Sequence, residues 1–277
     1  MNRNVFIVAG ARSAIGEFGG SFRPLTPIEL ISPVINAAIE RSGLPKDKIG
    51  KVILGNTLSP LNPNIARGAA ITCGVPPEVP AFSIHCACAS ALQALISGAS
   101  ALMMGEADTA LVGGVELMSN APYILMSTRW GQRLRHSQAV DQLWWCMQED
   151  PIMGGMGQAA DFLAKKYGIS REEQDELAAL SHKRALTAQS EGYFSNEIIP
   201  IEIKSGSKSN TAKMDEHPRQ DATLDKLARL SPAFSPDGTV TAGNASSIND
   251  GAAAIVLEEA CKEYVRERIS LSVPFSE

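Results

Sequence analysis

The stretch of sequence that decides the fold is SIHCACASALQALISGASALMMG, residues 83–105. Its later part, residues 91–105, carries small and apolar side chains on every side. That pattern predicts a helix buried between layers, because a surface helix keeps one polar face. Cys88 falls at the junction where an apparent strand ends and this helix begins. The stretch therefore predicts a layered protein with a thiol at the N-terminal end of a buried helix.

Short β-branched runs alternate with longer helical stretches around this segment. The runs lie at 5–8, 51–54 and 108–112, and the helical stretches at 27–42 and 90–105. This alternation is typical of strand–helix–strand crossovers and predicts an α/β fold with a parallel or mixed sheet. Further along, TVTAGNASSINDGAAAIVL at 239–257 turns through a Gly/Asn/Ser loop into another buried strand or helix.

The middle of the chain differs in composition from the rest. This difference predicts a domain at 120–230, inserted into a domain formed by 1–119 and 231–260. Three tryptophans and more charge mark this part. Ser170, with Glu173 three residues later, predicts the start of a helix over 171–192. The polar run KSGSKSNTAK at 204–213 lacks apolar periodicity and predicts a solvated, mobile connector.

Composition excludes several classes of function. The chain has 25 basic and 30 acidic residues, a formal charge of -5 and no basic run, so we do not expect a nucleic-acid partner. Ser, Gly, Arg or Glu interrupts every long apolar run, so we expect no membrane span. The N-terminal apolar stretch is too short for a signal peptide, and five cysteines are an odd number. We therefore expect reduced thiols and a cytoplasmic location.

Cys88 is the residue most suited to chemistry. Unpaired N–H groups and the positive dipole end at a helix N-terminus lower a thiol pKa and can stabilise an oxyanion, so a nucleophile is one interpretation. A small buried hydrophobic residue is the other. Cys86 and Cys88 form a CxC pair, but the sequence has no second pair at zinc spacing. We therefore expect no metal site.

The segment HCACASA at 85–91 resembles the N-x-x-C-A-S-G segment of the thiolase family, and Cys88 falls at the position of its nucleophile. Other thiolase-like segments stand in the same order along the chain, up to about Leu257. They are ARSAIGEFGG at 11–20, GGVELMSNAPY at 113–123, RWGQR at 129–133, YGISREEQDELA at 167–178 and TVTAGNASSINDGAAA at 239–254.

The resemblance implies both a fold and an activity. The fold is one βαβαβαββ half of a five-layered αβαβα sandwich, with a mainly helical loop domain inserted at 120–230 to hold coenzyme A. The activity is acyl transfer through a cysteine thioester, in thiolysis or condensation of acetoacetyl-CoA or other 3-ketoacyl-CoA substrates. CoA thioesters are then substrates, and no cofactor is implied.

The resemblance also implies roles for residues of the loop domain. Met156 and Gly157 would line the acyl and pantetheine end of the pocket, Arg219 would lie near the adenine, and Ser246 near the pantetheine. Each residue has a plainer interpretation as well. Met156 could be core, Arg219 a surface charge and Ser246 a turn former.

The chain departs from the family pattern near the nucleophile and the ligand. His85 replaces an asparagine and Ala91 a glycine, while Phe162 replaces an asparagine and Ser247 a glycine. A glycine at those two positions matters if the backbone φ is positive or if backbones touch. His85 also raises the hypothesis of a Cys–His pair, against a packed or solvated histidine.

The larger departure concerns the NEAF-like, GHP and C-x-G segments of the family, which these 277 residues do not contain. Cys261 has no following glycine and is not assigned as the second catalytic cysteine. Residues 261–277 are expected to form a tail that begins as an amphipathic helix. We expect a homo-oligomer, or a second chain that supplies the other thiolase half. The alternative function is a non-catalytic CoA-binding or structural subunit, or a truncated inactive thiolase.

Overall fold

The computed structural model describes residues 4–59, 61–126, 128–134, 136–149, 151, 154–205 and 208–259, which form two compact units. Unit 1 contains the residues up to Asn120, residues 195–216 and those from Asn249 onward, and unit 2 contains residues 121–194 and 217–248. These boundaries differ from the predicted insertion at 120–230, because 195–216 belongs to unit 1 and 231–248 to unit 2. The predicted tail at 261–277 lies outside the described residues.

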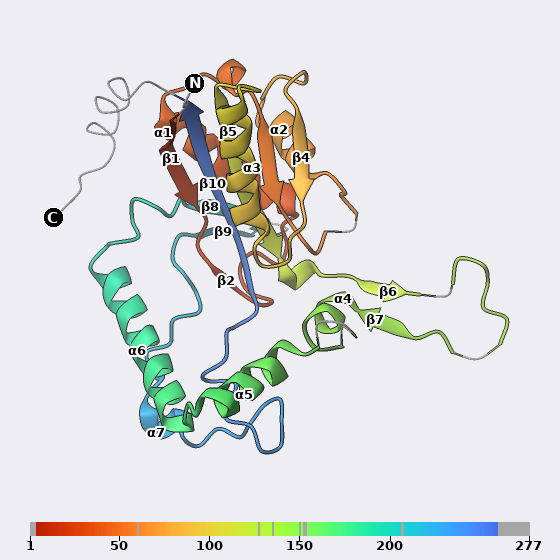
Figure 1. The fold of residues 1–277 in the computed structure, drawn as a ribbon, viewed down its shortest axis with the longest axis vertical. Coiled ribbons are helices and arrows are strands. Elements are labelled where there is room, and N and C mark those ends of the chain that lie inside the picture. The colour runs from red at the N-terminus through yellow and green to blue at the C-terminus, as the bar shows by residue number, and fades with distance from the viewer. Residues whose placement is uncertain are drawn as a thin grey trace. The chain divides into compact units, whose positions relative to one another are not determined.

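A mixed sheet forms the centre of unit 1 (Figure 1). The strand order is β1-β10-β5-β3-β4, and β2 also pairs with β10. Strand β10 is antiparallel to β1 and β5, whereas β3 is parallel to β4 and β5. The prediction of an α/β fold with a mixed sheet is confirmed. The strands are β1 (Val5–Arg12), β2 (Gly16–Glu17), β3 (Val52–Gly55), β4 (Ala81–Ile84), β5 (Thr109–Leu117) and β10 (Asn249–Glu259).

Helices cover both faces of this sheet. Helices α1 (Pro27–Ser42) and α2 (Ile65–Thr72) pack against each other on one face, and α3 (Ser90–Met104) lies on the opposite face (Figure 1). Helix α1 has the bounds that the sequence predicts. Thr26 and Glu29 form a capping box at its start, and Gly43 ends it with a φ of 66°. Two short 3-10 helices, η1 (Lys46–Lys48) and η2 (Met118–Asn120), complete this part.

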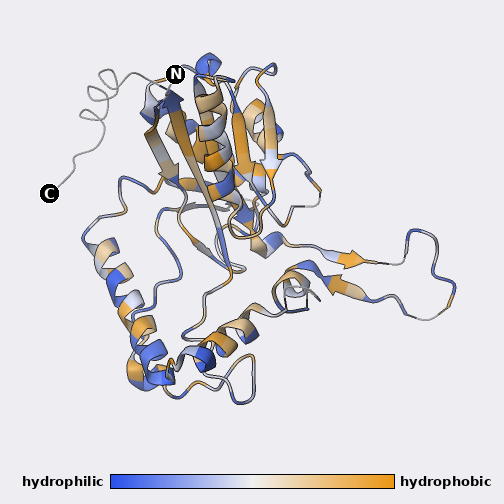
Figure 2. Ribbon diagram, in the orientation of Figure 1, coloured by the Kyte–Doolittle hydropathy of each residue, from blue (hydrophilic) through white to orange (hydrophobic). Residues whose placement is uncertain are grey.

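Helix α3 packs on the sheet through a face of small residues. Ala94 and Leu102 are fully buried with Ile53 and Val112 in one apolar cluster, and a Cβ on Gly98 would lie 2.5 Å from Val112 Cγ1. Figure 2 shows the apolar colouring of the strands beneath it. The opposite face of the helix is open. Its exposed apolar side chains are Leu92 (60 % exposed), Ile96 (47 %), Met103 (57 %) and Met104 (69 %).

The prediction that this helix is buried between layers therefore holds for only one of its faces within the described residues. By length and composition, residues 87–104 could also cross a membrane, and they are the only such helix in the described part of the chain. A helix in the core of a layered protein has the same length and composition, so this match is weak evidence for a membrane span.

The predicted connector at 204–213 is instead part of a β-hairpin. Strands β8 (Ile201–Ser205) and β9 (Lys208–Ala212) pair antiparallel, with Ile201 opposite Ala212. Ile201, Ile203 and Ala212 are buried. The prediction was wrong because backbone groups of any residue type can make a sheet ladder, and only the residues just before 204 showed the period of two.

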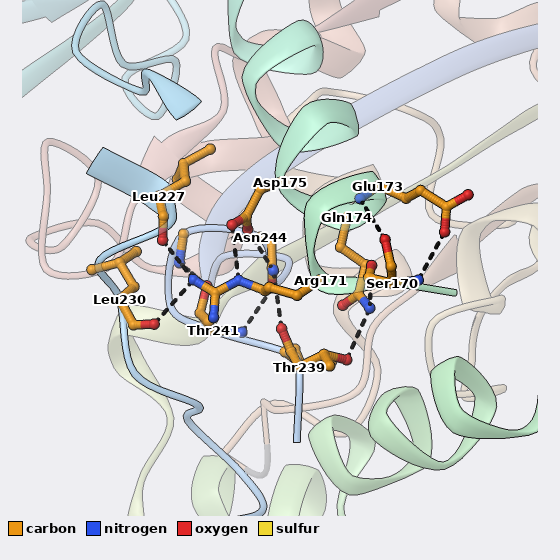
Figure 3. A network of polar contacts seen from close by, with 12 residues as sticks. Ser170, Arg171, Glu173, Gln174, Asp175, Leu227, Leu230, Thr239, Thr241 and Asn244 are labelled. Carbon is orange, nitrogen blue, oxygen red and sulfur yellow. Dashed lines mark hydrogen bonds and ion pairs between the residues drawn. The ribbon is translucent and has the colours of Figure 1, made fainter. Parts of the chain in front are cut away.

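Unit 2 is mainly helical (Figure 1). Its elements are a hairpin of β6 (Tyr123–Leu125) and β7 (Ala139–Asp141), then α4 (Gln142–Trp144), the π-helical turn η3 (Trp145–Glu149), α5 (Met156–Tyr167), α6 (Arg171–Ser190) and α7 (Leu224–Leu227). Helix α6 starts where the sequence predicts, because the Ser170 hydroxyl accepts from Glu173 N at 3.1 Å and the Glu173 carboxylate accepts from Ser170 N at 2.8 Å (Figure 3).

A polar network connects α6 to the loops that follow α7 (Figure 3). Asp175, 4 % exposed, accepts from Arg171 Nε and from Asn244 Nδ2, at 2.8 and 2.9 Å. The Arg171 guanidinium also donates to the carbonyls of Leu227 and Leu230, at 2.6 and 3.0 Å. The Arg171–Asp175 pair therefore joins the start of α6 to the end of α7 and to the loop that contains Asn244.

Candidate active site

Cys88 lies in the tight connection between β4 and α3. Residues 85–89 make this connection, and Ala89 N donates to Cys86 O at 3.0 Å. The bond closes a four-residue turn with Cys88 at its third position. This turn places Cys88 two residues before Ser90, the first helical residue of α3, at the strand–helix junction that the sequence predicts.

The backbone of this turn is strained. Ala87 has a φ of 46°, and no other non-glycine residue in the described ranges has a positive φ. Ser90 stabilises this conformation, because its hydroxyl donates to Ala87 O at 2.6 Å and accepts from Cys86 N at 2.8 Å. Strained turns between a strand and a helix project a nucleophile out of the backbone in other enzymes. The geometry here resembles such a turn.

Two glycines of the sheet let the start of α3 approach closely. A Cβ on Gly55 would lie 2.4 Å from the backbone carbonyl carbon of Ser90, and one on Gly114 would lie 2.8 Å from Ala91 Cβ. Gly55 and Gly114 are also partners in the β3–β5 register. Our sequence reasoning missed this pair. The available signal was a glycine within each apolar strand pattern, which often marks close backbone approach.

The described cysteines differ in their surroundings. Cys86 and Cys88 are exposed free thiols, and the Cys88 sulfur makes no hydrogen bond to any described residue. Cys73 is buried, its Sγ lies 3.5 Å from Ser32 O, and burial raises the pKa of its thiol. Cys88 is therefore accessible to a substrate and Cys73 is not. The described residues contain no group of three or more side chains suited to hold a metal ion.

His85 forms no hydrogen bond with Cys88, the candidate nucleophile, in this structure. The side chain is exposed, and its Nδ1 accepts from Ala87 N at 3.4 Å. This long bond supports the turn and makes no contact with the Cys88 thiol. Proton transfer from Cys88 therefore has no evident acceptor among the described residues.

The three residues suggested for coenzyme A binding all belong to unit 2, whereas Cys88 belongs to unit 1. Arg219 lines a cavity of about 510 Å³ along α6, together with Leu180, Lys183 and other residues of that helix. Ser246 lines a second cavity of about 370 Å³, bordered by α6 and residues 243–247. Two of the three candidate residues, Arg219 and Ser246, therefore line cavities beside helix α6.

Met156 is the first residue of α5, is 54 % exposed, and borders neither of these two cavities. Gly157 is buried, and a Cβ there would lie 2.1 Å from the Phe234 ring. The glycine therefore lets α5 pack on Phe234. A plain core role for Met156 does not fit its exposure.

The substituted glycines of the family pattern cause no backbone conflict here. Neither Ala91 nor Ser247 has a positive φ, since Ala87 alone does among described non-glycine residues. Phe162 is 64 % exposed on α5. None of these three departures distorts the elements that carry the candidate site.

Comparisons with known proteins agree with this architecture. Residues 5–260 match the family model described as "Thiolase, N-terminal domain". The chain is 41 % identical to a beta-ketothiolase of Cupriavidus necator, covering 94 % of this chain and 66 % of that protein. It is 43 % identical to an acetyl-CoA acetyltransferase of Pseudomonas aeruginosa, covering 94 % and 67 %. The chain thus spans about two thirds of the length of these relatives.

Solved structures give the same result. An acetyl-CoA acetyltransferase of Bacillus anthracis superposes with a TM-score of 0.92 at 44 % identity, covering 97 % of this chain and 68 % of that one. Human mitochondrial 3-ketoacyl-CoA thiolase in complex with CoA superposes with a TM-score of 0.87 at 34 % identity, covering 96 % and 67 %. With a family match over nearly the whole chain and a shared fold at this identity, the chain belongs to the thiolase family of acyl-CoA acyltransferases.

Proposed function

We propose that the chain takes part in acyl transfer between coenzyme A thioesters through a thioester on Cys88. One observation carries the proposal, the exposed free thiol on a strained turn directly before α3. At such a place, backbone N–H groups at the start of the helix can stabilise a developing oxyanion. Cys88 attacks the acyl carbonyl carbon, the bond to the CoA sulfur breaks, and CoA leaves with the thiol proton while the acyl group stays on Cys88.

The substrate class is a 3-ketoacyl-CoA or acetyl-CoA. Relatives named beta-ketothiolase, 3-ketoacyl-CoA thiolase and acetyl-CoA acetyltransferase support this choice. A cytoplasmic location fits the proposal, because the nucleophile has to remain a reduced thiol.

The test is single acylation of the intact protein. Incubation with acetyl-CoA should add one acetyl mass, which maps to the peptide containing Cys88 and is removed by hydroxylamine. Cys86→Ser is the matched control, because Cys86 is an equally exposed thiol on the same turn and its loss should leave the label in place. Loss of the label in Cys86→Ser, with Cys88 unlabelled in the wild type, would remove Cys88 from the nucleophile role.

We further propose that Arg219 contributes a charge-assisted contact to a phosphate or the adenine of coenzyme A. Arg219→Ala should weaken CoA binding by about 1.5–3 kcal/mol, which corresponds to about 10–150-fold in Kd. Calorimetric titration measures the change. Arg229→Ala is the control, since Arg229 is exposed and borders neither cavity. Equal affinities in the two variants would place Arg219 outside the site.

We also propose that another layer of protein covers the exposed face of α3. Another copy of this chain supplies that layer, or a second chain that brings the other thiolase half. The exposed row from Leu92 to Met104 supports this, because apolar patches of that kind mark interfaces.

The expected result is an oligomer that persists on dilution, since obligate interfaces bury about 2,000–5,000 Å². Light scattering across a dilution series measures it. Ile96→Glu should shift the species toward monomer, whereas Leu61→Glu, which puts the same charge on another exposed leucine, should not. A wild-type chain that stays monomeric at micromolar concentration would contradict the covering layer.

A non-catalytic CoA-binding subunit is the second candidate function. It is favoured by the lack of a base hydrogen-bonded to the Cys88 thiol among the described residues. In that case CoA should bind with equal affinity to the wild type and to Cys88→Ser, while the wild type takes up no acyl group.

A further inference from the structure

Among the described residues, only His182, on α6, borders both the larger and the smaller of the two cavities described above. His182 and Arg219 both line the larger cavity. His182, His217 and residues 243–247 line the smaller one. His182 therefore lies between the two residues suggested for coenzyme A, Arg219 and Ser246. Our sequence reasoning gave it no role.

His182 holds Arg219 through a hydrogen bond to its backbone. Arg219 N donates to His182 Nδ1 at 3.2 Å. An imidazole nitrogen accepts a hydrogen bond only while it carries no proton, so this bond requires the neutral tautomer with its hydrogen on Nε2. Protonation of Nδ1 would turn the acceptor into a second donor facing the same N–H group. The anchor of Arg219 would then be lost.

The surroundings of His182 favour its neutral form. Burial lowers its pKa, and the nearby His217 and Arg219 lower it further, while Asp221 acts in the opposite direction. The rings of His182 and His217 are 6.2 Å apart. Glu176 and Lys183 on α6 also face the larger cavity. Residues 243–247, on the other side, carry no titratable group.

His217 has a related feature. Its Nδ1 is buried and has no hydrogen-bond partner. A positive charge on His182 would lie beside this ring and near Arg219, and both groups lower the pKa of His182. Neutral His182 is thus the form that this cluster accommodates.

We propose that His182 is a positioning residue, whose neutral imidazole fixes the backbone at Arg219 and so makes coenzyme A binding sensitive to acid. The CoA part of this inference depends on the proposed function of Arg219. Because the pKa of His182 is lowered in the folded chain, the anchor is complete above the ordinary histidine value of about 6.5 and is lost as the pH falls through the folded value. Affinity for CoA should fall over the same range.

The direction in which CoA affinity changes in acid distinguishes a positioning role of His182 from a direct attraction between its charge and the ligand. A protonated His182 that merely attracted a phosphate would bind CoA more tightly in acid, whereas a lost anchor makes binding weaker. The phosphate of the ligand also titrates, near pH 6. His182→Gln removes this ambiguity, because the glutamine Oε1 can accept from Arg219 N and does not titrate.

The first measurement is amide hydrogen exchange at Arg219 without ligand, at about pH 5 and about pH 7.5, each rate divided by that of an unprotected amide. Wild-type protection should fall by about tenfold in acid, as expected for loss of one hydrogen bond. His182→Gln should keep its protection at both values, and His182→Ala should lack it at both. Equal wild-type protection at the two values would overturn the proposal, as would the same acid loss in His182→Gln.

The second measurement is the Kd for CoA at the same two values. Relative to His182→Gln, the wild type should lose about tenfold more affinity in acid. If the wild type instead binds CoA more tightly in acid than His182→Gln does, the positioning role is overturned and a protonated His182 attracts the phosphate directly. The expected exchange pattern with no CoA binding in any variant would support the anchor at Arg219 and overturn the proposed CoA site instead.

Discussion

Thiolysis of acetoacetyl-CoA by this 277-residue chain alone is expected to be at least about 10²–10⁴-fold slower than by a thiolase with its full set of catalytic groups. That factor is what one positioned general acid or base supplies. In the structure the Cys88 sulfur forms no hydrogen bond with an imidazole or carboxylate among the described residues, and His85 Nδ1 accepts from Ala87 N. The rate losses caused by removing separate catalytic groups need not multiply, so the expected factor accounts for the missing base alone.

The assay follows loss of acetoacetyl-CoA absorbance with free CoA, first for the chain alone and then with a candidate chain that carries the GHP and C-x-G segments. A large gain in rate upon mixing supports the expectation, and Cys88→Ala should remove all of that gain. Robust turnover by the lone chain, abolished in Cys88→Ala, would contradict it. The base would then lie within these residues, and His85→Gln would test the first candidate.

Much of the fold was predictable because hydrophobic period determines secondary structure. The bounds of α1 follow from its caps at Thr26 and Gly43, and the start of α6 from Ser170 and Glu173. The position of Cys88 was predictable for the same reason, since a strand pattern gives way to a helical one around it. These features depend on residues close together in the sequence.

Features that depend on distant or backbone contacts were not predictable in this way. The strain at Ala87 is a property of its φ, which an alanine in sequence does not reveal. The close approach of α3 depends on Gly55 and Gly114, which come together only through strand pairing. The hairpin near 204–213 is made by backbone bonds. The role that we propose for His182 likewise depends on its bond to Arg219, 37 residues further along the chain.

Asp175→Ala is expected to lower the free energy of unfolding of unit 2 by about 2–4 kcal/mol. Breaking a buried ion pair costs about 3–5 kcal/mol, and we reduce that because the Arg171 side chain is 20 % exposed. The substitution leaves Arg171 with its two carbonyl acceptors but without its counter-charge. It also removes the Asp175 acceptor of Asn244, which helps to hold the loop that contains Ser246.

Urea unfolding followed by tryptophan fluorescence measures this change, because Trp130, Trp144 and Trp145 all lie in unit 2 and report on it specifically. Asp221→Ala is the matched control. Asp221 pairs with Lys226 at 2.9 Å, but both side chains are exposed, 68 % and 59 %, so its removal should change the urea midpoint much less than Asp175→Ala does. A shift in Asp175→Ala no larger than in this control would show that α6 is held by its apolar contacts. The polar network of Figure 3 would then orient the 243–247 loop without stabilising unit 2.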